Sequence, residues 1–335
     1  MSKPRLLFRA DASPAIGFGH VARLCALIEE AGARGFEPVA MFGGDASAIR
    51  GWANDRKLAV ELGDWSTSEV VHCAQHVRGI FVDGPALALA LIPELSGLET
   101  VVIDDVGNCP LAVSIVVNHN VTGPSLAATY PAASRRLLGR HYLMLRRDIV
   151  YHGRGSCRPA NRSRLRVVVS YGSSDPTGAT ARTLRLLGPE RALDVVAIVG
   201  PGFRDDDRLL AEVARATAIG HTVDVQRCPK DPGTWFLSAD AAICSAGGTL
   251  GELAFLGCPA LANATAFDQV AAAHCQVQDG LIAGGRNWDE TDDETIRDDI
   301  ARFVIDDTGR TALRDAALAT ADGQGPRRVI DALEP

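Results

Sequence analysis

The N-terminal motif combines residue types that suit proton transfer beside a bound ligand. It reads RADAS at residues 9–13 and IGFGHVAR at residues 16–23. Gly17 and Gly19 would let the backbone turn tightly and approach a ligand closely. His20 would stand at the start of a helix, where the positive end of the helix dipole favours a neutral imidazole, the form that a general base requires.

Two charged residues flank this turn. Asp11 comes before the glycines and is a second candidate catalytic residue, and Arg23 follows His20 by about one helical turn and could contact substrate. The alternative interpretation is a glycine turn with a helix-capping histidine and a solvated arginine. The combination of histidine, arginine and a strand-to-helix position favours a functional site.

A second glycine-rich segment, SAGGTLGE at residues 245–252, follows an apolar run and opens a helical pattern. Backbone N–H groups at such a helix start can hold a phosphate, and a carboxylate one turn later suits the diol of a ribose. The alternative is a helix capped by Thr249, with Glu252 as its capping-box partner. The predicted nucleotide-binding residues are Ser245, Ala246, Gly247, Gly248, Thr249 and Glu252.

Two further loops of the second half carry small or polar residues after apolar runs. Gly172 and Ser173, in YGSSDPTG at residues 171–178, would let a substrate come close; alternatively, Asp175 or Thr177 caps the next helix. Asp268 and Gln269 could hydrogen-bond a sugar, although Asp268 could also simply cap a helix.

Polar residues also end three strands of the first half, in the segments VDGP (82–85), IDD (103–105) and NHN (118–120). Asp83 and Asn120 are candidate substrate contacts from this group, although loop capping explains each residue alone slightly better. His72 and His76 are four residues apart, but no third ligand is evident, so a solvated helix face is the better interpretation and no metal site is predicted.

Short apolar runs alternate with helical patterns along the whole chain, which predicts parallel strands and doubly wound sheets. In the first half, apolar residues recur at helical spacing between Val21 and Ala31. The expected strands are 5–10, 38–42, 58–62, 79–82, 100–103, 115–117, 165–170, 193–199, 222–225, 241–244 and 259–262. The expected helices include 46–54, 68–76, 86–95, 177–187, 206–216, 249–256, 268–279, 294–305 and 311–321.

The 335 residues favour two domains, each with its own core. Residues 151–164 are polar, basic and glycine-containing and form the best linker candidate. We therefore expect a first Rossmann-like domain over 1–150, on the sugar and catalytic side, and a second over 165–335 that binds the nucleotide. Ligands of open α/β sheets lie outside the carboxyl ends of the strands, which predicts a cleft between the two domains.

Composition limits the classes of partner. The net charge is −7 and aromatic residues make up 5%, which argue against a nucleic-acid surface. None of the eight cysteines forms a C-x-x-C pair, which favours a reducing cytoplasm over a disulfide scaffold. No signal peptide and no membrane span is expected, and oligomeric state is not indicated.

Taken in order, the motifs resemble one known family. They are RADAS with IGFGHVAR, IDD, LRRD at 145–148, VSYGSSDP at 169–176, and SAGGTLGELAFLGCP at 245–259 followed by DQ at 268–269. The chain resembles, over roughly residues 5–280, the UDP-sugar hydrolase of the pseudaminic acid pathway and related spore-coat polysaccharide biosynthesis proteins. That family is similar in fold to GT-B glycosyltransferases.

The resemblance implies hydrolysis of a UDP-linked 2,4-diacetamido-2,4,6-trideoxy hexose. Water would attack the anomeric carbon with inversion, UDP would leave, and neither a metal nor another cofactor would be needed. It implies that His20 is the base, that residues 246–249 hold the diphosphate and that Glu252 holds the ribose.

The chain departs from the family pattern in three places. Pro85 stands where the family has a tyrosine, residues 266–269 read AFDQ where the family has Ala-Asn/Asp-Asn-Gln, and Gly172-Ser173 replaces a glycine pair. Two alternatives therefore stay open beside hydrolysis. One is a GT-B glycosyltransferase that passes the sugar to an acceptor, and the other is a nucleotide-sugar-binding protein without catalysis.

Overall fold

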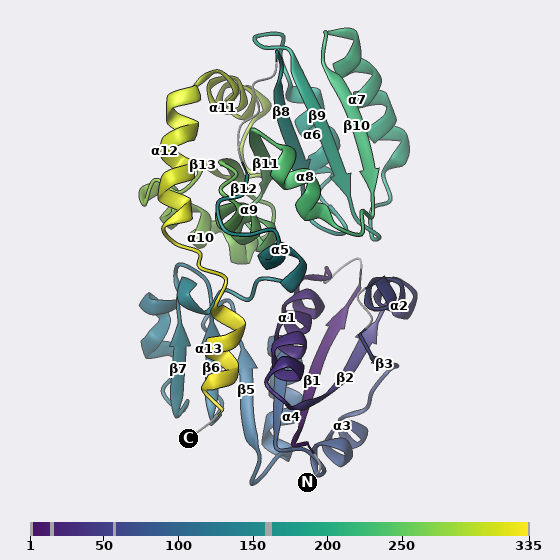
Figure 1. Ribbon diagram of the computed structural model, residues 1–335, viewed down its shortest axis with the longest axis vertical. Helices are drawn as coiled ribbons and strands as arrows, with labels where there is room; N and C mark the ends of the chain where they lie inside the picture. Colours follow the sequence, from purple (N-terminus) through teal and green to yellow (C-terminus); the bar gives the residue numbers. More distant parts are fainter. Residues whose placement is uncertain (1–2, 14–16, 56–57, 158–162, 334–335) are drawn as a thin grey trace. The chain divides into compact units, whose positions relative to one another are not determined.

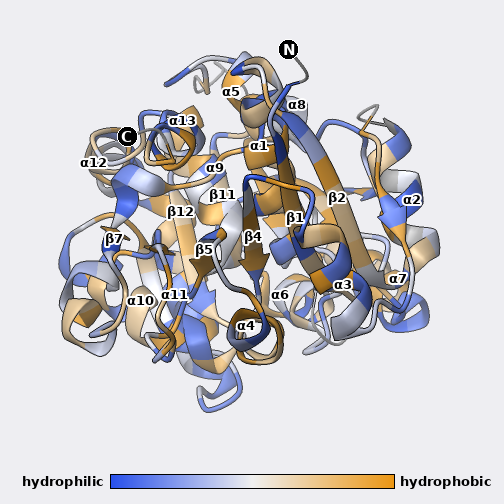
Figure 2. Cartoon of the chain, turned by 90° about the horizontal axis from the view of Figure 1, so that it is seen from below, coloured by the Kyte–Doolittle hydropathy of each residue, from blue (hydrophilic) through white to orange (hydrophobic). Residues whose placement is uncertain are grey.

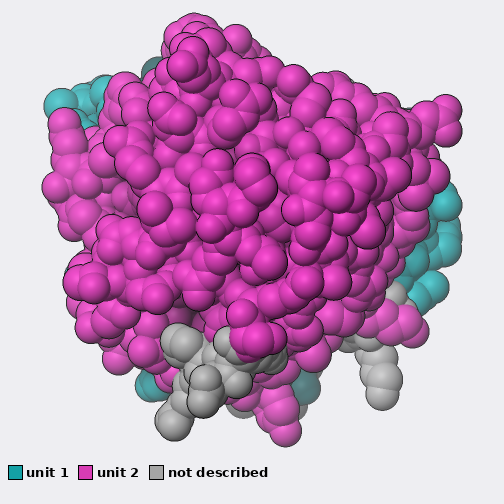
Figure 3. All heavy atoms as spheres, turned by 90° about the horizontal axis from the view of Figure 1, so that it is seen from above, with its two compact units in different colours: residues 1–147, 323–335 teal, residues 148–322 magenta. Residues whose placement is uncertain are grey.

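A computed structural model describes residues 3–13, 17–55, 58–157 and 163–333. The chain, traced in Figure 1, divides into two compact units: residues 1–147 with 323–335, and residues 148–322. Figure 3 colours the first unit teal and the second magenta. Each unit holds one parallel sheet with helices on both faces, which confirms the expected fold class of two doubly wound domains.

The first unit is built on a seven-stranded parallel sheet in the order β3-β2-β1-β4-β5-β6-β7. The strands are β1 (Arg5–Ala12), β2 (Glu37–Gly44), β3 (Glu61–Leu62), β4 (Gly79–Asp83), β5 (Glu99–Ile103), β6 (Ile115–Asn118) and β7 (Arg135–Leu138). The helices are α1 (Gly19–Ala33), α2 (Ala46–Asp55), α3 (Thr67–Ala74), α4 (Pro85–Leu91) and α13 (Gly325–Asp331). Short 3-10 helices lie at η1 (Ile92–Glu94), η2 (Gly123–Thr129) and η3 (Arg140–Tyr142).

Both faces of this sheet are apolar, because helices cover each of them (Figure 2). Leu6, Phe8 and Ala10 of β1 pack with α1 and α13 on one face. Leu7 packs on the other face with residues of α3 and α4, including Val70. Successive residues of a strand point to opposite faces, so this alternation also decides on which face each polar residue of β1 and β4 lies.

The second unit holds a six-stranded parallel sheet in the order β10-β9-β8-β11-β12-β13. Its strands are β8 (Leu165–Ser170), β9 (Leu193–Val199), β10 (Thr222–Arg227), β11 (Ala241–Ser245), β12 (Ala260–Ala264) and β13 (Ala283–Asn287). Its helices are α6 (Ala179–Leu186), α7 (Asp206–Ala218), α8 (Pro232–Ser238), α9 (Gly248–Leu256), α10 (Phe267–Gln278), α11 (Asp293–Ile305) and α12 (Asp307–Leu318). The short helix α5 (Arg147–Tyr151) spans the boundary between the units.

The last residues of the chain belong to the first unit, whereas the sequence analysis assigned everything after residue 164 to the second domain. Val329 and Ile330 of α13 are buried against α1, and the Arg78 guanidinium donates to the Leu333 carbonyl at 2.8 Å. Of the expected linker, residues 158–162 lie outside the described residues. None of the described helices has the length and apolar character that a membrane-spanning segment needs.

Candidate functional site

The first sheet reverses its strand order between β1 and β4, which is where open α/β sheets bind ligands. β1 leads into the His20 motif and β4 ends at Asp83. Gly17 adopts a φ of +84° and donates its N–H to the Ser13 carbonyl at 2.7 Å, so the turn before α1 needs a glycine there. Ile16 of the motif lies outside the described residues.

His20 and Asp83 form a close pair. Nδ1 of His20 lies 2.6 Å from Oδ1 of Asp83, whose side chain is fully buried. The same Nδ1 lies 2.9 Å from Nη2 of Arg23, which is itself a donor. Because the bond to the carboxylate is shorter and charge-assisted, we assign the hydrogen to Nδ1, donating to Asp83. This tautomer leaves Nε2 of His20 with a free lone pair, on a side chain that is 25% exposed.

Arg23 ties this pair to a second carboxylate. Its Nε and Nη2 donate to the two oxygens of Asp83 at 3.0 and 2.8 Å, and its Nη1 donates to Oδ2 of Asp105 at 2.5 Å. The two carboxylates hold the pKa of Arg23 above its usual value against the effect of burial, which is the largest single influence and acts in the opposite direction. Arg23 therefore donates to two of the protein's own carboxylates, and its role as a substrate contact stays a prediction.

Asp105 follows β5 and joins the network around His20 through Arg23, although the sequence analysis did not select it. Burial raises its pKa, but Arg23, His119 and His20 outweigh burial and lower it to about 2. Asn120, a predicted substrate contact, donates through Nδ2 to the backbone carbonyl of Asp105 at 3.1 Å. The IDD segment was the only sequence signal for this position. Nothing in that segment distinguishes Asp105 from Asp104, so Asp105 was not selected.

His119 is buried beside Asp105, and its Nδ1 lies 4.0 Å from Oδ1 of that residue with no hydrogen-bond partner among the described atoms. Burial lowers the pKa of His119 to about 4, although the charge of Asp105 acts in the opposite direction. His119 is therefore a neutral imidazole at neutral pH.

This neutral histidine makes folding pH-dependent. An unfolded histidine has a pKa of about 6.5, so between pH 6.5 and 4 the unfolded chain binds the extra proton and stability falls as pH falls. We expect about 2–3 kcal/mol of the free energy of unfolding to be lost from this group between pH 7 and 4.5. Urea unfolding of the wild type and of His119→Asn at both pH values tests this, because the variant should lose less; an equal loss would contradict the assignment.

Asp11, the second predicted catalytic residue, contacts Arg9 and not His20. Arg9 is buried, and its Nη1 donates to the Ala10 carbonyl at 2.6 Å and to the Asp11 carboxylate. Strand alternation places Asp11 with Leu7 on the face of the sheet that α3 and α4 cover, opposite to α1. Among the described contacts, Asp83 supplies the carboxylate that orients His20.

Gly43 makes room for the Arg9–Asp11 pair from the neighbouring strand. A Cβ on Gly43 would lie 2.3 Å from Oδ1 of Asp11 and 3.3 Å from Nη2 of Arg9. The pairing of Arg9 with Asp11 was not predicted, because an arginine inside an apolar strand gives no sign of whether it is paired or exposed.

Two polar side chains at the strand ends accept hydrogen bonds from the backbone of the following loops, as the capping alternative predicted. The carboxylate of Asp104 accepts the backbone N–H groups of three successive residues, Val106, Gly107 and Asn108, at 2.8–3.1 Å. Asn118 accepts the N–H of Asn120 at 3.1 Å and donates to the hydroxyl of Tyr130 at 3.0 Å. These bonds fix the loops that carry Asp105 and Asn120.

The second sheet reverses its strand order between β8 and β11, and the glycine-rich segment follows β11. Ser245 ends the strand, and Gly247 is the N-cap of α9 with no side-chain capping bond. Gly248 is exposed at the first position of the helix. Exposed backbone N–H groups at this helix start suit a phosphate.

The capping alternative for this segment does not hold, because the N-cap is Gly247 and neither Thr249 nor Glu252 caps it. Both side chains are half-buried on the first turns of α9. Ala246 is buried, and its N–H donates to the Asn263 carbonyl of β12 at 2.9 Å, which fixes the loop to the next strand.

In the loop after β8, one residue fits the capping interpretation and two remain candidate substrate contacts. Asp175 accepts the N–H groups of Ala179 and Thr180 at 2.8 Å each, so it caps α6 as the alternative predicted. Gly172 is exposed with a φ of +80°, and the Ser173 carbonyl accepts the N–H of Gly202 at 2.9 Å. Gly172 and Ser173 thus stay accessible at the strand end as candidate substrate contacts.

The loop after β12 carries Asp268 and Gln269. Asp268 is exposed and is not the helix cap, since Ala266 is the N-cap of α10 and no side chain caps it. Oε1 of Gln269 accepts the Thr265 N–H at 3.0 Å, and its Nε2 lies 3.4 Å from the position that a Cβ on Gly247 would take. Gln269 is therefore next to the glycine-rich loop.

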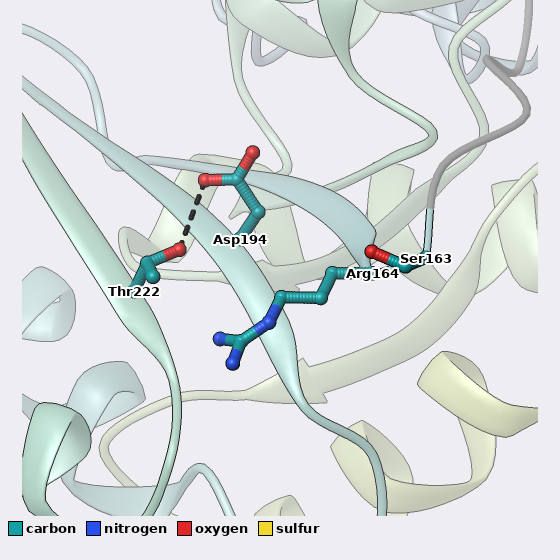
Figure 4. Close-up of a pocket in the computed structure, with 4 residues that line it drawn as sticks. All are labelled: Ser163, Arg164, Asp194 and Thr222. Atoms are coloured by element: carbon teal, nitrogen blue, oxygen red, sulfur yellow. Dashed lines mark hydrogen bonds between the residues drawn. The ribbon is translucent and has the colours of Figure 1, made fainter.

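A shallow pocket of about 400 Å³ lies elsewhere in the second unit (Figure 4). Ser163, Arg164, Asp194 and Thr222 line it, and they stand where β8, β9 and β10 begin. Oγ1 of Thr222 donates to Asp194 at 3.1 Å, and Arg166 pairs with the same carboxylate. The pocket lies at the amino ends of the strands, whereas the glycine-rich loop follows the carboxyl end of β11. We therefore do not assign the pocket to the ligand site.

Comparison with known proteins establishes the fold. No family model and no curated protein matches the chain. Among solved structures, MurG of Acinetobacter baumannii superimposes with a TM-score of 0.71 at 17% identity, over 99% of both chains. MnaA of S. aureus, solved with UDP, gives 0.67 at 8% identity, over 99% of this chain and 96% of its own.

A third match is Anabaena Alr3699/HepE in complex with UDP-glucose, with a TM-score of 0.62 at 15% identity, over 98% of this chain and 99% of its own. The near-complete coverage in each case shows that the two Rossmann-like units together make the GT-B fold. At these identities the likeness concerns the fold alone.

Proposed function

We propose that this protein is an enzyme that hydrolyses a UDP-linked amino or deoxy sugar at the anomeric carbon, with inversion of configuration. The observation that carries the proposal is the His20–Asp83 pair, which leaves Nε2 of His20 unprotonated at the strand-order reversal of the first sheet. The resemblance of the motifs to the UDP-sugar hydrolase of the pseudaminic acid pathway and the solved structures with UDP or UDP-glucose support the same ligand class.

In the proposed reaction, Nε2 of His20 takes a proton from water while the water oxygen bonds to the anomeric carbon. The bond from that carbon to the phosphate oxygen breaks, and UDP leaves with the bonding electrons. Asp83 accepts the Nδ1–H bond throughout, so it orients the ring and stabilises the imidazolium that forms. The residues of the chain supply the base for this step, so we propose no metal and no other cofactor.

The second unit would hold the nucleotide. The exposed N–H groups at the start of α9 suit the diphosphate, and Gln269 lies beside them. Glu252 lies on the next turn of α9, and we propose that it holds the ribose.

If Glu252 holds the ribose, Glu252→Ala should raise KM by about 10-fold or more with little change in kcat, because the loss of a charge-assisted hydrogen bond costs about 1.5–3 kcal/mol. Steady-state UDP release over a substrate series measures both parameters. Glu190→Ala, at a residue outside the site, is the control, and a fall in kcat alone would contradict the ribose role.

A glycosyltransferase is the second candidate, since one neighbour is a UDP-glucosyltransferase of Polygonum tinctorium and Pro85 replaces the tyrosine of the hydrolase pattern. In it, an acceptor hydroxyl takes the place of water at His20.

We propose that the protein acts in the cytoplasm, in synthesis of a bacterial surface sugar of the nonulosonic acid type. We propose no nucleic-acid partner, in keeping with the net charge of −7.

The test is to incubate the purified protein with a panel of UDP- and CMP-linked amino sugars, without acceptor and with EDTA, and to follow free nucleotide by chromatography. Release of UDP with one sugar supports metal-free hydrolysis. No release, together with a thermal shift on adding UDP, would replace hydrolysis by transfer or by binding alone. No release and no thermal shift would remove the nucleotide-sugar assignment.

A further inference from the structure

We infer that Asp105 is a positioning residue that keeps His20 basic by neutralising Arg23. The inference deepens the proposed function and rests on it, since it assigns a purpose to the charges behind the proposed base. The argument depends on the order in which the charged groups contact one another.

The four groups form one chain of alternating charge that starts at the imidazole. Nδ1 of His20 contacts Asp83 at 2.6 Å, Asp83 takes two bonds from Arg23 at 2.8 and 3.0 Å, and Arg23 reaches Asp105 at 2.5 Å. Two secondary-structure elements, α1 and β4, and the loop after β5 supply a single network, so no local sequence feature explains it. The side chains of Arg23 and Asp105 are largely buried, at 16% and 18% exposure, which limits screening by water.

Charge counting shows what Asp105 adds. With a neutral His20, the two carboxylates and Arg23 sum to −1, and the sum becomes zero when His20 takes a proton. Without the charge of Asp105, the corresponding sums are zero and +1, and the Arg23 guanidinium, 2.9 Å from Nδ1, opposes an imidazolium. Asp105 therefore favours the protonation that a general base must undergo.

Among the described residues, the other groups beside the network do not supply this charge. His119 contacts the network from the loop after β6, but burial lowers its pKa to about 4, so it is neutral across the range in which His20 would act. Asn120, on the same loop, is uncharged and binds Asp105 through its amide. In the described first unit, Asp83 and Asp105 are the carboxylates that contact Arg23.

The test follows the His20 ring directly by NMR, with 15N-labelled histidine and assignment by His20→Asn. Asp105→Asn should move the midpoint of the His20 titration to lower pH by about one unit. Arg23→Met removes the opposing positive charge and should move it to higher pH. Arg23→Lys keeps the charge and should give the smaller shift. A disturbance of packing alone would not move the midpoint in opposite directions for the two charge changes.

An unchanged or raised midpoint of the His20 titration in Asp105→Asn would overturn the inference. Asp105→Glu keeps the charge, so its midpoint should equal that of the wild type. If Arg23→Met does not fold, the two Asp105 variants decide alone. The NMR readout needs no turnover, so it stays decisive if the protein proves not to release UDP. Where UDP is released, Asp105→Asn should lower kcat about 3–10-fold and move the acid limb of its pH profile in the same direction as the NMR midpoint.

Discussion

Replacing His20 by Asn is expected to lower kcat for UDP release by about 10²–10⁴-fold while KM changes little. Asn fills a similar volume and can still donate a hydrogen bond to Asp83, but it cannot take a proton from water. The loss therefore falls on the chemical step, where the free Nε2 of His20 acts. Steady-state kinetics at a pH above the acid limb measures both constants.

His72→Asn is the matched control, because His72 is an exposed histidine on α3 and contacts the ring of His76 instead of the network. The control should keep the wild-type rate. If His20→Asn also keeps that rate, His20 is not the base, and the geometry of the His20–Asp83 pair has another purpose.

Arg23→Met should destabilise the protein by about 3–5 kcal/mol, the cost of breaking a buried ion pair from one side. The substitution leaves the carboxylates of Asp83 and Asp105 close together and largely buried without their shared cation. Part of the cost should disappear at low pH, since protonation of either carboxylate relieves the repulsion. Urea unfolding at pH 7 and pH 5 measures both effects.

Arg135→Met provides the comparison, because Arg135 pairs with Glu99 at 2.9 Å on the surface and is 45% exposed. Surface pairs of this kind contribute about 0–1 kcal/mol. A loss in Arg23→Met no larger than in Arg135→Met would show that the Arg23 network does not stabilise the first unit.

The sequence predicted both sheets because apolar runs alternate with helical patterns, a signal that local residues carry by themselves. It failed at the sheet edges, where strands are short or half-exposed. β7 begins with Arg135 and Arg136, and β13 contains Gly284 and Gly285, so neither looks like a buried strand. β3 is limited to Glu61–Leu62 of the expected 58–62.

The sequence predicted at which strand ends the candidate site lies, but not which carboxylate contacts His20. His20 follows β1 and Asp83 ends β4, and parallel strands bring their carboxyl ends to one side of the sheet. Which carboxylate meets the imidazole depends on the face of the sheet, and both faces of β1 are apolar, so its sequence cannot say on which one Asp11 lies. Only the packing of α1 shows that Asp83 and not Asp11 contacts His20.

The most direct test of the proposed hydrolysis is to run the reaction in H₂¹⁸O and to locate the label by mass spectrometry. Attack of water on the anomeric carbon predicts that ¹⁸O appears in the free sugar and that UDP stays unlabelled, and His20→Asn should form labelled sugar more slowly by the factor expected for kcat. Label in the UDP would mean attack at phosphorus, which would contradict the proposed reaction.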